Sequence, residues 1–247
     1  MFPVQVLLGL VAAAVSPRGF IRTECAFVTI MEALQLVGLL VADDCAGTLN
    51  RAVTYLSYIH ISLQPWCYNE WQWAMSEMRT LMHPEAARTA RRGEEHKRLV
   101  RGLSAAWCVG TLLRLVPCFR EPCYYCAQRE HFCAFDGSSA CTMMGSLHIY
   151  WRLPLRPTNY LLPGMWGHFA LCFLPTALNG DKYERAQMGL LFATGAAASF
   201  VVAFYANPAT AFDEGPSLWC IVAIPQHLIT YFMALRWRRC AVTKAHF

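Results

Sequence analysis

Charged side chains are scarce in this sequence. Only 15% of its 247 residues are Asp, Glu, Lys or Arg, and 56% are hydrophobic, whereas a typical soluble domain is ~25% charged. The charge is concentrated in short runs between apolar segments of roughly 20 residues, the length that crosses the hydrocarbon layer of a bilayer. The composition therefore argues against a soluble domain and predicts an all-α protein that crosses a membrane several times.

Seven apolar segments are the predicted membrane spans. They cover residues 2–15, 26–42, 52–75, 99–117, 161–178, 186–206 and 217–235, within a single domain of residues 1–247. The first could instead be a cleaved signal peptide, because Ala12, Ala13 and Ala14 offer the small residues of a cleavage site. However, signal peptides usually have Lys or Arg before their apolar core, and this segment has neither there. The predicted fold is a seven-helix transmembrane bundle.

Lys and Arg are distributed unequally between the segments that join these spans. If the N-terminus is outside, most of them fall in the inner segments, and the outer segments hold only Arg51, Arg120, Arg129, Arg152 and Arg156. Because Lys and Arg favour the cytoplasmic side, the predicted topology has the N-terminus outside and the C-terminus inside. The basic run 88–98 is then a cytoplasmic loop near anionic lipid headgroups, and the net charge of +5 requires no nucleic-acid partner.

A second C-x-x-C motif is missing from the cysteine-rich part of the chain. Half of the twelve cysteines fall in the predicted outer segments, namely Cys45, Cys118, Cys123, Cys126, Cys133 and Cys141. An even set in one non-reducing compartment predicts disulfides, whose pairing the sequence leaves open. The alternative is a zinc site that combines the C-x-x-C pair with neighbouring cysteines and His131. The disulfide interpretation places the outer loops at the plasma membrane or in the secretory pathway.

The outer segment 118–160 is longer than an ordinary loop, and such loops usually have a function or a structure of their own. Its second half is aromatic and apolar, with His148 and Arg152 inserted. This composition predicts a segment that lies at the lipid headgroups or closes over the mouth of the bundle as a lid. The alternative is an interfacial helix without a role in binding.

Polar side chains recur near the predicted midpoints of four spans. They are Glu32 and Gln35, His60 and Gln64, His168, and Gln226 and His227. Residues at helical spacing share a helix face, so Glu32 and Gln35 are expected on one face of the second span, and His60 and Gln64 on one face of the third. Because polar groups are costly in hydrocarbon unless they are partnered, such residues mark a candidate site. For any one of them, the alternative is a hydrogen bond that joins two helices.

Several motifs carry a resemblance to a known family. They are EALQ in the second predicted span, then CAGTLN, YIHISLQPWCYNEW, GSLHIYWRLPLRPTNYLLP with His168 after it, and DEGPSLWCIVAIPQ. Together they resemble a family of uncharacterised multi-pass membrane proteins of bacteria, algae and large DNA viruses, in which HI is followed by QP and later by HIxWxLPL. The resemblance implies an integral membrane fold. It implies no activity and no catalytic residue.

Two better-known membrane classes fit less well. The last predicted span, residues 217–235, has no Lys, and a retinal protein needs one for its Schiff base. Membrane hydrolases that hold zinc with several His usually have two His one turn apart in their final helix, whereas His227 is followed four residues later by Tyr231. Three His from different helices, His60, His168 and His227, could still bind a transition metal beside Glu32.

Three functions are consistent with these features. The preferred one is binding or transport of a small molecule or ion in a midplane cavity beneath the lid. The cavity would be lined by Glu32, Gln35, His60, Gln64, His148, His168, Gln226 and His227. The second is a membrane metalloenzyme that uses the three His as ligands and Glu32 as general base. The third is a scaffold or receptor that acts through its Cys-rich outer loop.

Overall fold

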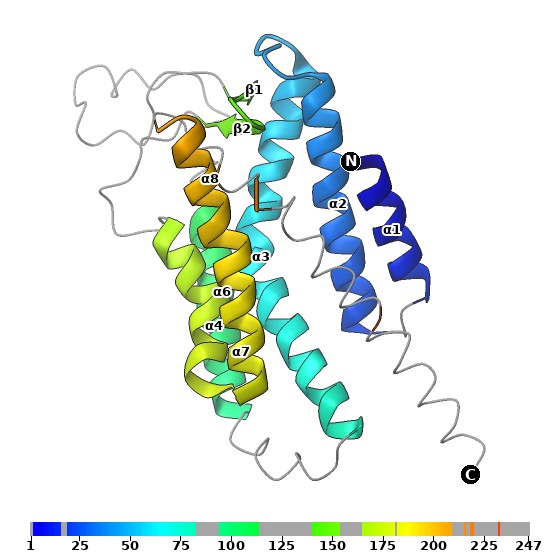
Figure 1. Ribbon diagram of the computed structural model, residues 1–247, viewed down its shortest axis with the longest axis vertical. Helices are drawn as coiled ribbons and strands as arrows, with labels where there is room; N and C mark the ends of the chain where they lie inside the picture. Colours follow the sequence, from blue (N-terminus) through cyan, green and yellow to red (C-terminus); the bar gives the residue numbers. More distant parts are fainter. Residues whose placement is uncertain are drawn as a thin grey trace.

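The computed structural model describes residues 2–15, 19–82, 94–113, 140–153, 165–180, 182–208, 215, 218, 219 and 232. Within them the chain is mostly helical, with one small sheet (Figure 1). The elements are α1 (Phe2–Val15), α2 (Phe20–Leu40), α3 (Thr48–Met82), α4 (Glu94–Leu113), β1 (Cys141–Met144), β2 (Ile149–Arg152), α6 (Met165–Asn179), α7 (Lys182–Leu191), η3 (Phe192–Ala197) and α8 (Ala198–Ala206). The predicted helical class is therefore confirmed for most of the described chain.

Helix α3 is the central element of the bundle. It has 35 residues, which at 1.5 Å per residue makes it about 52 Å long, and it contacts α2, α4, α6 and both strands. Figure 1 shows α1 and α2 on one side of α3, with α4, α6, α7 and α8 on the other. Pro65 lies inside this helix, and because proline has no backbone N–H it cannot donate the usual helical hydrogen bond.

The prediction of an all-α fold is wrong at residues 141–152. Strands β1 and β2 form an antiparallel hairpin in which Cys141 pairs with Arg152 and Met144 with Ile149. The sequence of β2 is IYWR, and β-branched and aromatic residues favour strands. The turn is closed by the Gly145 N–H, which donates to the His148 carbonyl at 2.7 Å. Within the segment interpreted as interfacial, residues 149–152 therefore form a strand, and residues 154–160 lie outside the described residues.

The number of membrane spans stays a prediction. In the described part of the chain, one helical segment is both long enough and apolar enough to cross a membrane, Arg22–Leu40 of α2, and Gly167–Leu178 of α6 is apolar but shorter. The α-helices in Figure 1 do not correspond one to one with the predicted spans, because α7, η3 and α8 follow one another directly and cover the span 186–206. Most of the span 217–235 lies outside the described residues.

An aromatic cluster holds α6, α7, η3 and α8 against α3. It contains Tyr68 of α3, Phe169 and Phe173 of α6, Phe200 of α8, and Trp219. Gly195 of η3 faces this cluster, since a Cβ at its position would lie 2.5 Å from the indole nitrogen of Trp219. The wider π-helical turn of η3 thus coincides with the place where the backbone passes closest to a large side chain.

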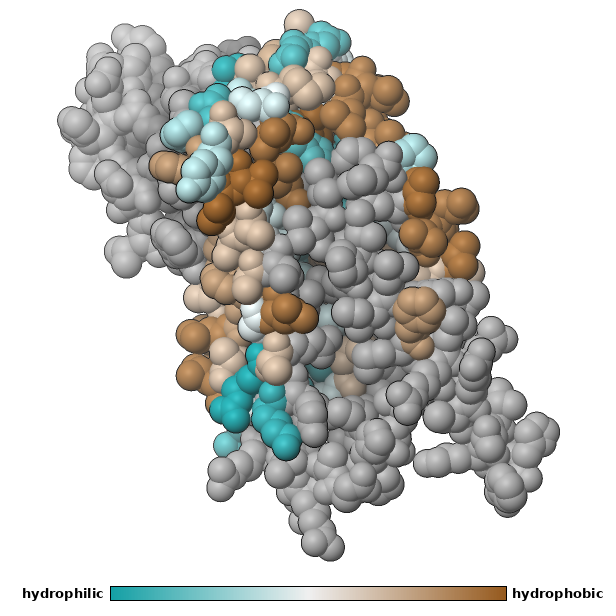
Figure 2. Space-filling model, viewed as in Figure 1, coloured by the Kyte–Doolittle hydropathy of each residue, from teal (hydrophilic) through white to brown (hydrophobic). Residues whose placement is uncertain are grey.

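The outer surface of the helices is apolar. Exposed hydrophobic side chains occur on α1, α2, α4, α6 and α8, for example Leu7, Ile30, Leu103, Leu174 and Val202, each at least half exposed. Among the coloured residues in Figure 2, hydrophobic ones predominate along the sides, and the strongly hydrophilic ones gather mainly toward the two ends of the coloured region. The interior, in contrast, contains many buried polar side chains.

Candidate functional site

The interface between α2 and α3 is polar, and a stacked pair of rings fixes its alignment. The Phe27 ring of α2 lies against the His60 ring of α3, with 3.8 Å between their centroids and an interplanar angle of 18°. The buried stripe of α2 continues through Met31 and Gln35 to Gly38. These spacings of three to four residues place the stripe on one face of the helix.

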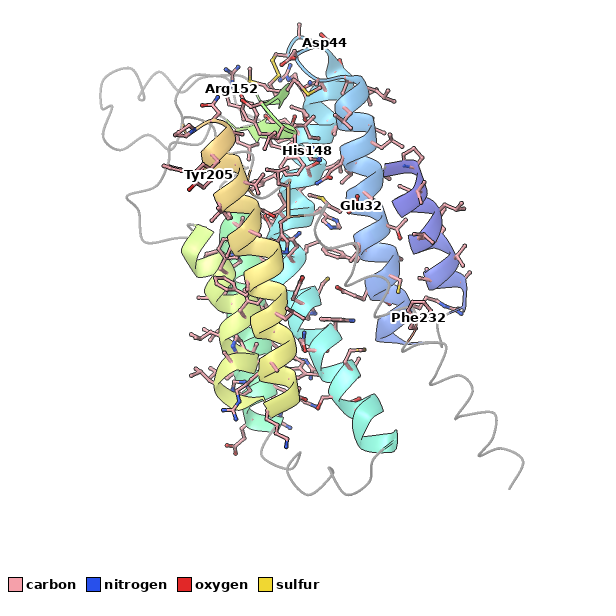
Figure 3. The ribbon with its side chains drawn as sticks, in the orientation of Figure 1. Glu32, Asp44, His148, Arg152, Tyr205 and Phe232 are labelled. Atoms are coloured by element: carbon pink, nitrogen blue, oxygen red, sulfur yellow. A yellow bond between two sulfur atoms is a disulfide. The ribbon has the colours of Figure 1, made fainter. Side chains whose placement is uncertain are left out.

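Glu32 enters this interface from α2. Its side chain is 1% exposed, and neither carboxyl oxygen has a hydrogen-bond partner among the described residues. Figure 3 shows Glu32 on the side of α2 that faces α3. Gln35, one turn further along α2, and Ser57 of α3 are both fully buried. A buried carboxyl without a partner is costly to the fold, so Glu32 is the strongest candidate for a functional group in this structure.

The predicted residues of α3 and α6 meet through one hydrogen bond. His168 Nε2 lies 3.1 Å from the side-chain oxygen of Gln64. Gln64 is one turn along α3 from His60. Asn69 adds a second link between the same helices, since its side-chain amide donates to the carbonyls of Pro65 at 2.7 Å and Leu171 at 2.8 Å. The structure therefore brings Gln64 and His168 together and attaches α6 to α3 through polar groups.

The described residues contain no group of three His, Cys, Asp or Glu side chains that could hold a metal ion. His60 contacts Phe27 and His168 contacts Gln64. Gln226 and His227, which the sequence analysis places in the same cavity, lie outside the described residues. The metal set of His60, His168 and His227 therefore stays a prediction.

The hairpin covers the ends of α2 and α3 and is anchored there by Asn50. The Asn50 amide donates to the carbonyls of Val41 at 2.6 Å and Thr142 at 2.8 Å, and its oxygen accepts the Thr142 N–H at 2.9 Å. The hydroxyls of Thr54 and Thr142 lie 2.8 Å apart. A Cβ at Gly38 would come within 3.0 Å of the Ile149 side chain, so the glycine permits this close contact.

His148 belongs to this hairpin. It is 3% exposed, and its Nδ1 accepts the N–H of Ile149 at 2.6 Å. Figure 3 shows His148 on the side of the hairpin that faces the helices, whereas Arg152 lies at its outer side. The described part of the segment predicted as a lid, residues 140–153, is thus anchored by hydrogen bonds at the α2–α3 end of the bundle. Its role as a lid stays a prediction.

One disulfide reinforces this attachment. Cys45, in the connection between α2 and α3, is bonded to Cys141 of β1, across 96 residues of chain. A bond that closes a loop of this length is worth about 4–5 kcal/mol in the chain-entropy model. The prediction of disulfides is confirmed for this pair. The other outer cysteines, Cys118, Cys123, Cys126 and Cys133, lie outside the described residues.

The opposite end of the bundle is held by ion pairs. Arg101 of α4 makes two hydrogen bonds to the carboxylate of Glu70 on α3, and its guanidinium lies 5.1 Å from the ring of Trp73. Lys97 of α4 pairs with Glu77 at 3.1 Å. These contacts join α3 and α4 where the sequence predicts the inner membrane surface.

Sequence reasoning missed Glu24. This residue is 3% exposed, and neither of its carboxyl oxygens has a hydrogen-bond partner in the described part of the structure. The predicted span began at residue 26, which left Glu24 outside it, whereas α2 begins at Phe20. The spacing of seven between Glu24 and Met31 is a signal that could have found it, because it places both on one helix face.

A helical protein that combines an apolar membrane-length helix, apolar outer surfaces, a polar interior and a disulfide is typical of membrane and secreted proteins. The chain belongs to a family of unknown function, DUF5765, whose model matches residues 4–240. This agrees with the expectation of an uncharacterised family. No curated protein and no solved structure matches the chain, so its function must be argued from the arrangement of its own residues.

Proposed function

We propose that this protein spans the membrane several times and binds or transports a small polar molecule or ion in the polar interior between α2, α3 and α6. The single observation that carries the proposal is Glu32, a carboxyl that is 1% exposed and unpartnered among the described residues. Natural proteins retain such costly groups mainly at functional sites, and in membranes they mark substrate and ion pathways.

The distribution of polarity supports the membrane part of the proposal. Apolar side chains face outward on five helices, and Glu32, Gln35, Ser57 and Asn69 are buried. A water-soluble bundle has the opposite arrangement, because its apolar residues drive folding by leaving water. In a bilayer, apolar surfaces face lipid and polar residues face the bundle interior.

The distance between two polar contacts on α3 also supports the membrane part of the proposal. Asn50 holds the hairpin at one end, and Glu70 holds Arg101 at the other. The twenty residues between them correspond to about 30 Å of helix, which is the thickness of the hydrocarbon layer. The disulfide lies at the end predicted to be outside, and the paired Lys97 and Arg101 at the end predicted to be inside, as oxidation and the positive-inside rule require.

The test is solute movement through purified protein in lipid vesicles. The probes are protons, Na⁺, K⁺, chloride, alanine, glutamate and glucose, each measured with the wild type, with Glu32→Gln, and with Glu95→Gln as the control. Glu95 is exposed at the start of α4, so its substitution leaves the interior unchanged. We expect at least one probe to cross with the wild type and with Glu95→Gln, and to cross at the background rate of protein-free vesicles with Glu32→Gln.

Two results would contradict the proposal. If no probe crosses or binds to the wild type, or if Glu32→Gln leaves every flux unchanged, the proposal is wrong. The folding of each variant is checked by its thermal unfolding midpoint and its elution volume in the same detergent. Because Gln has nearly the shape of Glu, a loss of flux in a folded Glu32→Gln variant reports on the carboxyl itself.

A further inference from the structure

Glu24 and Glu32 are two buried carboxyls on one helix. Eight residues separate them along α2, which corresponds to about 12 Å. Each is at least nine-tenths buried, and each has both carboxyl oxygens without a hydrogen-bond partner among the described residues. Two such groups on one helix are difficult to attribute to packing, because either would be cheaper to the fold as an apolar residue.

Polar side chains of α3 and α6 lie at levels from that of Phe27, between the two carboxyls, to about that of Glu24. The Phe27–His60 contact aligns α2 with α3, and Phe27 lies between Glu24 and Glu32 in the sequence. His60 is therefore at an intermediate level, and the hydrogen-bonded pair of Gln64 and His168 lies one turn further toward Glu24.

Glu32, His60, Gln64, His168 and Glu24 are referred to below as the polar column. This column continues beyond Glu24. Asn69 of α3 donates to the carbonyl of Leu171 on α6 at 2.8 Å, and the next residues on these two helices are Glu70 and the free cysteine Cys172. Glu70 in turn binds Arg101 near the inner end. Cys25, beside Glu24 in α2, and Cys108 of α4 are further buried thiols among the described residues. Ionisable and hydrogen-bonding groups thus follow one another through much of the bundle.

We propose that this column is a proton path through the bundle, in which Glu24 acts as a second carboxyl relay in addition to Glu32. The inference rests on the proposed function and names its substrate class, the proton. Chains of Asp, Glu and His are typical of proton relays in membrane pumps and transporters. Each step moves one proton from a donor group to the next acceptor, directly or through water, so that one proton taken up on one side is released on the other.

The arrangement fits a proton better than a dehydrated metal cation. A Na⁺-like or Ca²⁺-like ion needs about six oxygens gathered around one point, whereas the described carboxyls are single and about 12 Å apart along α2. A proton needs only one acceptor at each step. A buried, unpartnered carboxyl is least costly as the neutral acid. That form can release its proton to the next group, and the carboxylate left behind can then take up another.

The experiment measures proton flux in vesicles that contain the full-length protein and a trapped pH-sensitive dye. A K⁺ gradient with valinomycin supplies the driving potential. The variants are Glu24→Gln, Glu32→Gln, Glu24→Asp and the exposed control Glu95→Gln. We expect proton flux with the wild type and with Glu95→Gln, background flux with Glu24→Gln and Glu32→Gln, and partial recovery with Glu24→Asp, which restores a carboxyl.

The possible outcomes separate this inference from the proposed function. If the wild type moves another solute in a Glu32-dependent way but moves no protons, the proton path is wrong and the proposed function stands. If protons move and Glu24→Gln carries them at the wild-type rate, the role of Glu24 is wrong. If neither protons nor any other probe moves, both proposals fail. Should Glu24→Gln fail to fold, Glu24→Asp decides, because a shortened carboxyl side chain in a relay slows the flux, whereas one with no role leaves the flux unchanged.

Discussion

Buried polar residues of this protein fall into two groups that differ in their partners. Asn50 and Asn69 are almost completely buried, and their side-chain amides donate hydrogen bonds to carbonyls on other elements. Glu24 and Glu32 are equally buried, but their carboxyl oxygens are unpartnered within the described chain. The asparagines therefore stabilise the fold, and the glutamates cost it free energy.

This difference predicts opposite effects of two substitutions on stability. Glu32→Met replaces an unpartnered carboxyl by an apolar group of similar length and should raise the free energy of unfolding by about 1–3 kcal/mol. Asn50→Leu removes the partners of the Thr142 N–H and carbonyl and should lower it by about 2 kcal/mol or more. Thermal unfolding midpoints in one detergent measure both changes. A lower midpoint for Glu32→Met would show that its carboxyl has a structural role.

At the scale of elements, the sequence predicted the helical class of most of the described chain but not the hairpin. Apolar runs define α1 and the end of α8, and the predicted spans 2–15 and 186–206 end where those helices end. The hairpin of residues 141–152 was missed because it depends on partners far away in the sequence, above all Asn50 and Cys45. Periodicity within a segment contains no information on such contacts.

The candidate site was predicted in part for the same reason. Helical spacing could group Glu32 with Gln35 and His60 with Gln64, because each pair lies on one helix. The pairing of Gln64 with His168 could only be guessed from estimated membrane depth. Glu24 was lost because apolar composition locates the hydrocarbon layer rather than the end of a helix, and α2 extends six residues before the predicted span.

The contact between η3 and Trp219 gives a prediction at the same scale. Gly195→Ala places a methyl group where the indole of Trp219 lies and should lower the free energy of unfolding by about 1–3 kcal/mol. Gly189→Ala on α7 is the matched control, since its added Cβ meets nothing within 4 Å, and it should raise stability by up to about 1 kcal/mol through helix propensity. Thermal unfolding of both variants tests this. Equal effects would contradict the proposed close packing at Gly195.

At the scale of the whole molecule, the interior of the bundle is rich in polar side chains and its outer faces are apolar. Carboxyls, amides and imidazoles lie between the helices together with the aromatic cluster, and many leucine and valine side chains are exposed on the outer faces. The hydrophilic residues visible in Figure 2 are found mainly at the two ends. The anchored hairpin at one end and the ion pairs at the other mark the boundaries of the apolar zone. This arrangement is the reason for placing the bundle in a membrane.

The most direct test of this account is the environment of the outer faces in a lipid bilayer. Spin labels are attached at Leu103 of α4 and Val202 of α8, each half exposed, and at Ser146 in the hairpin turn, which is also exposed. Collisions with oxygen, which concentrates in lipid, are compared with collisions with a water-soluble nickel complex. The account predicts that the labels at Leu103 and Val202 collide mainly with oxygen and the label at Ser146 mainly with nickel. If all three positions collide mainly with nickel, the helices lie in water and the membrane-spanning account is wrong.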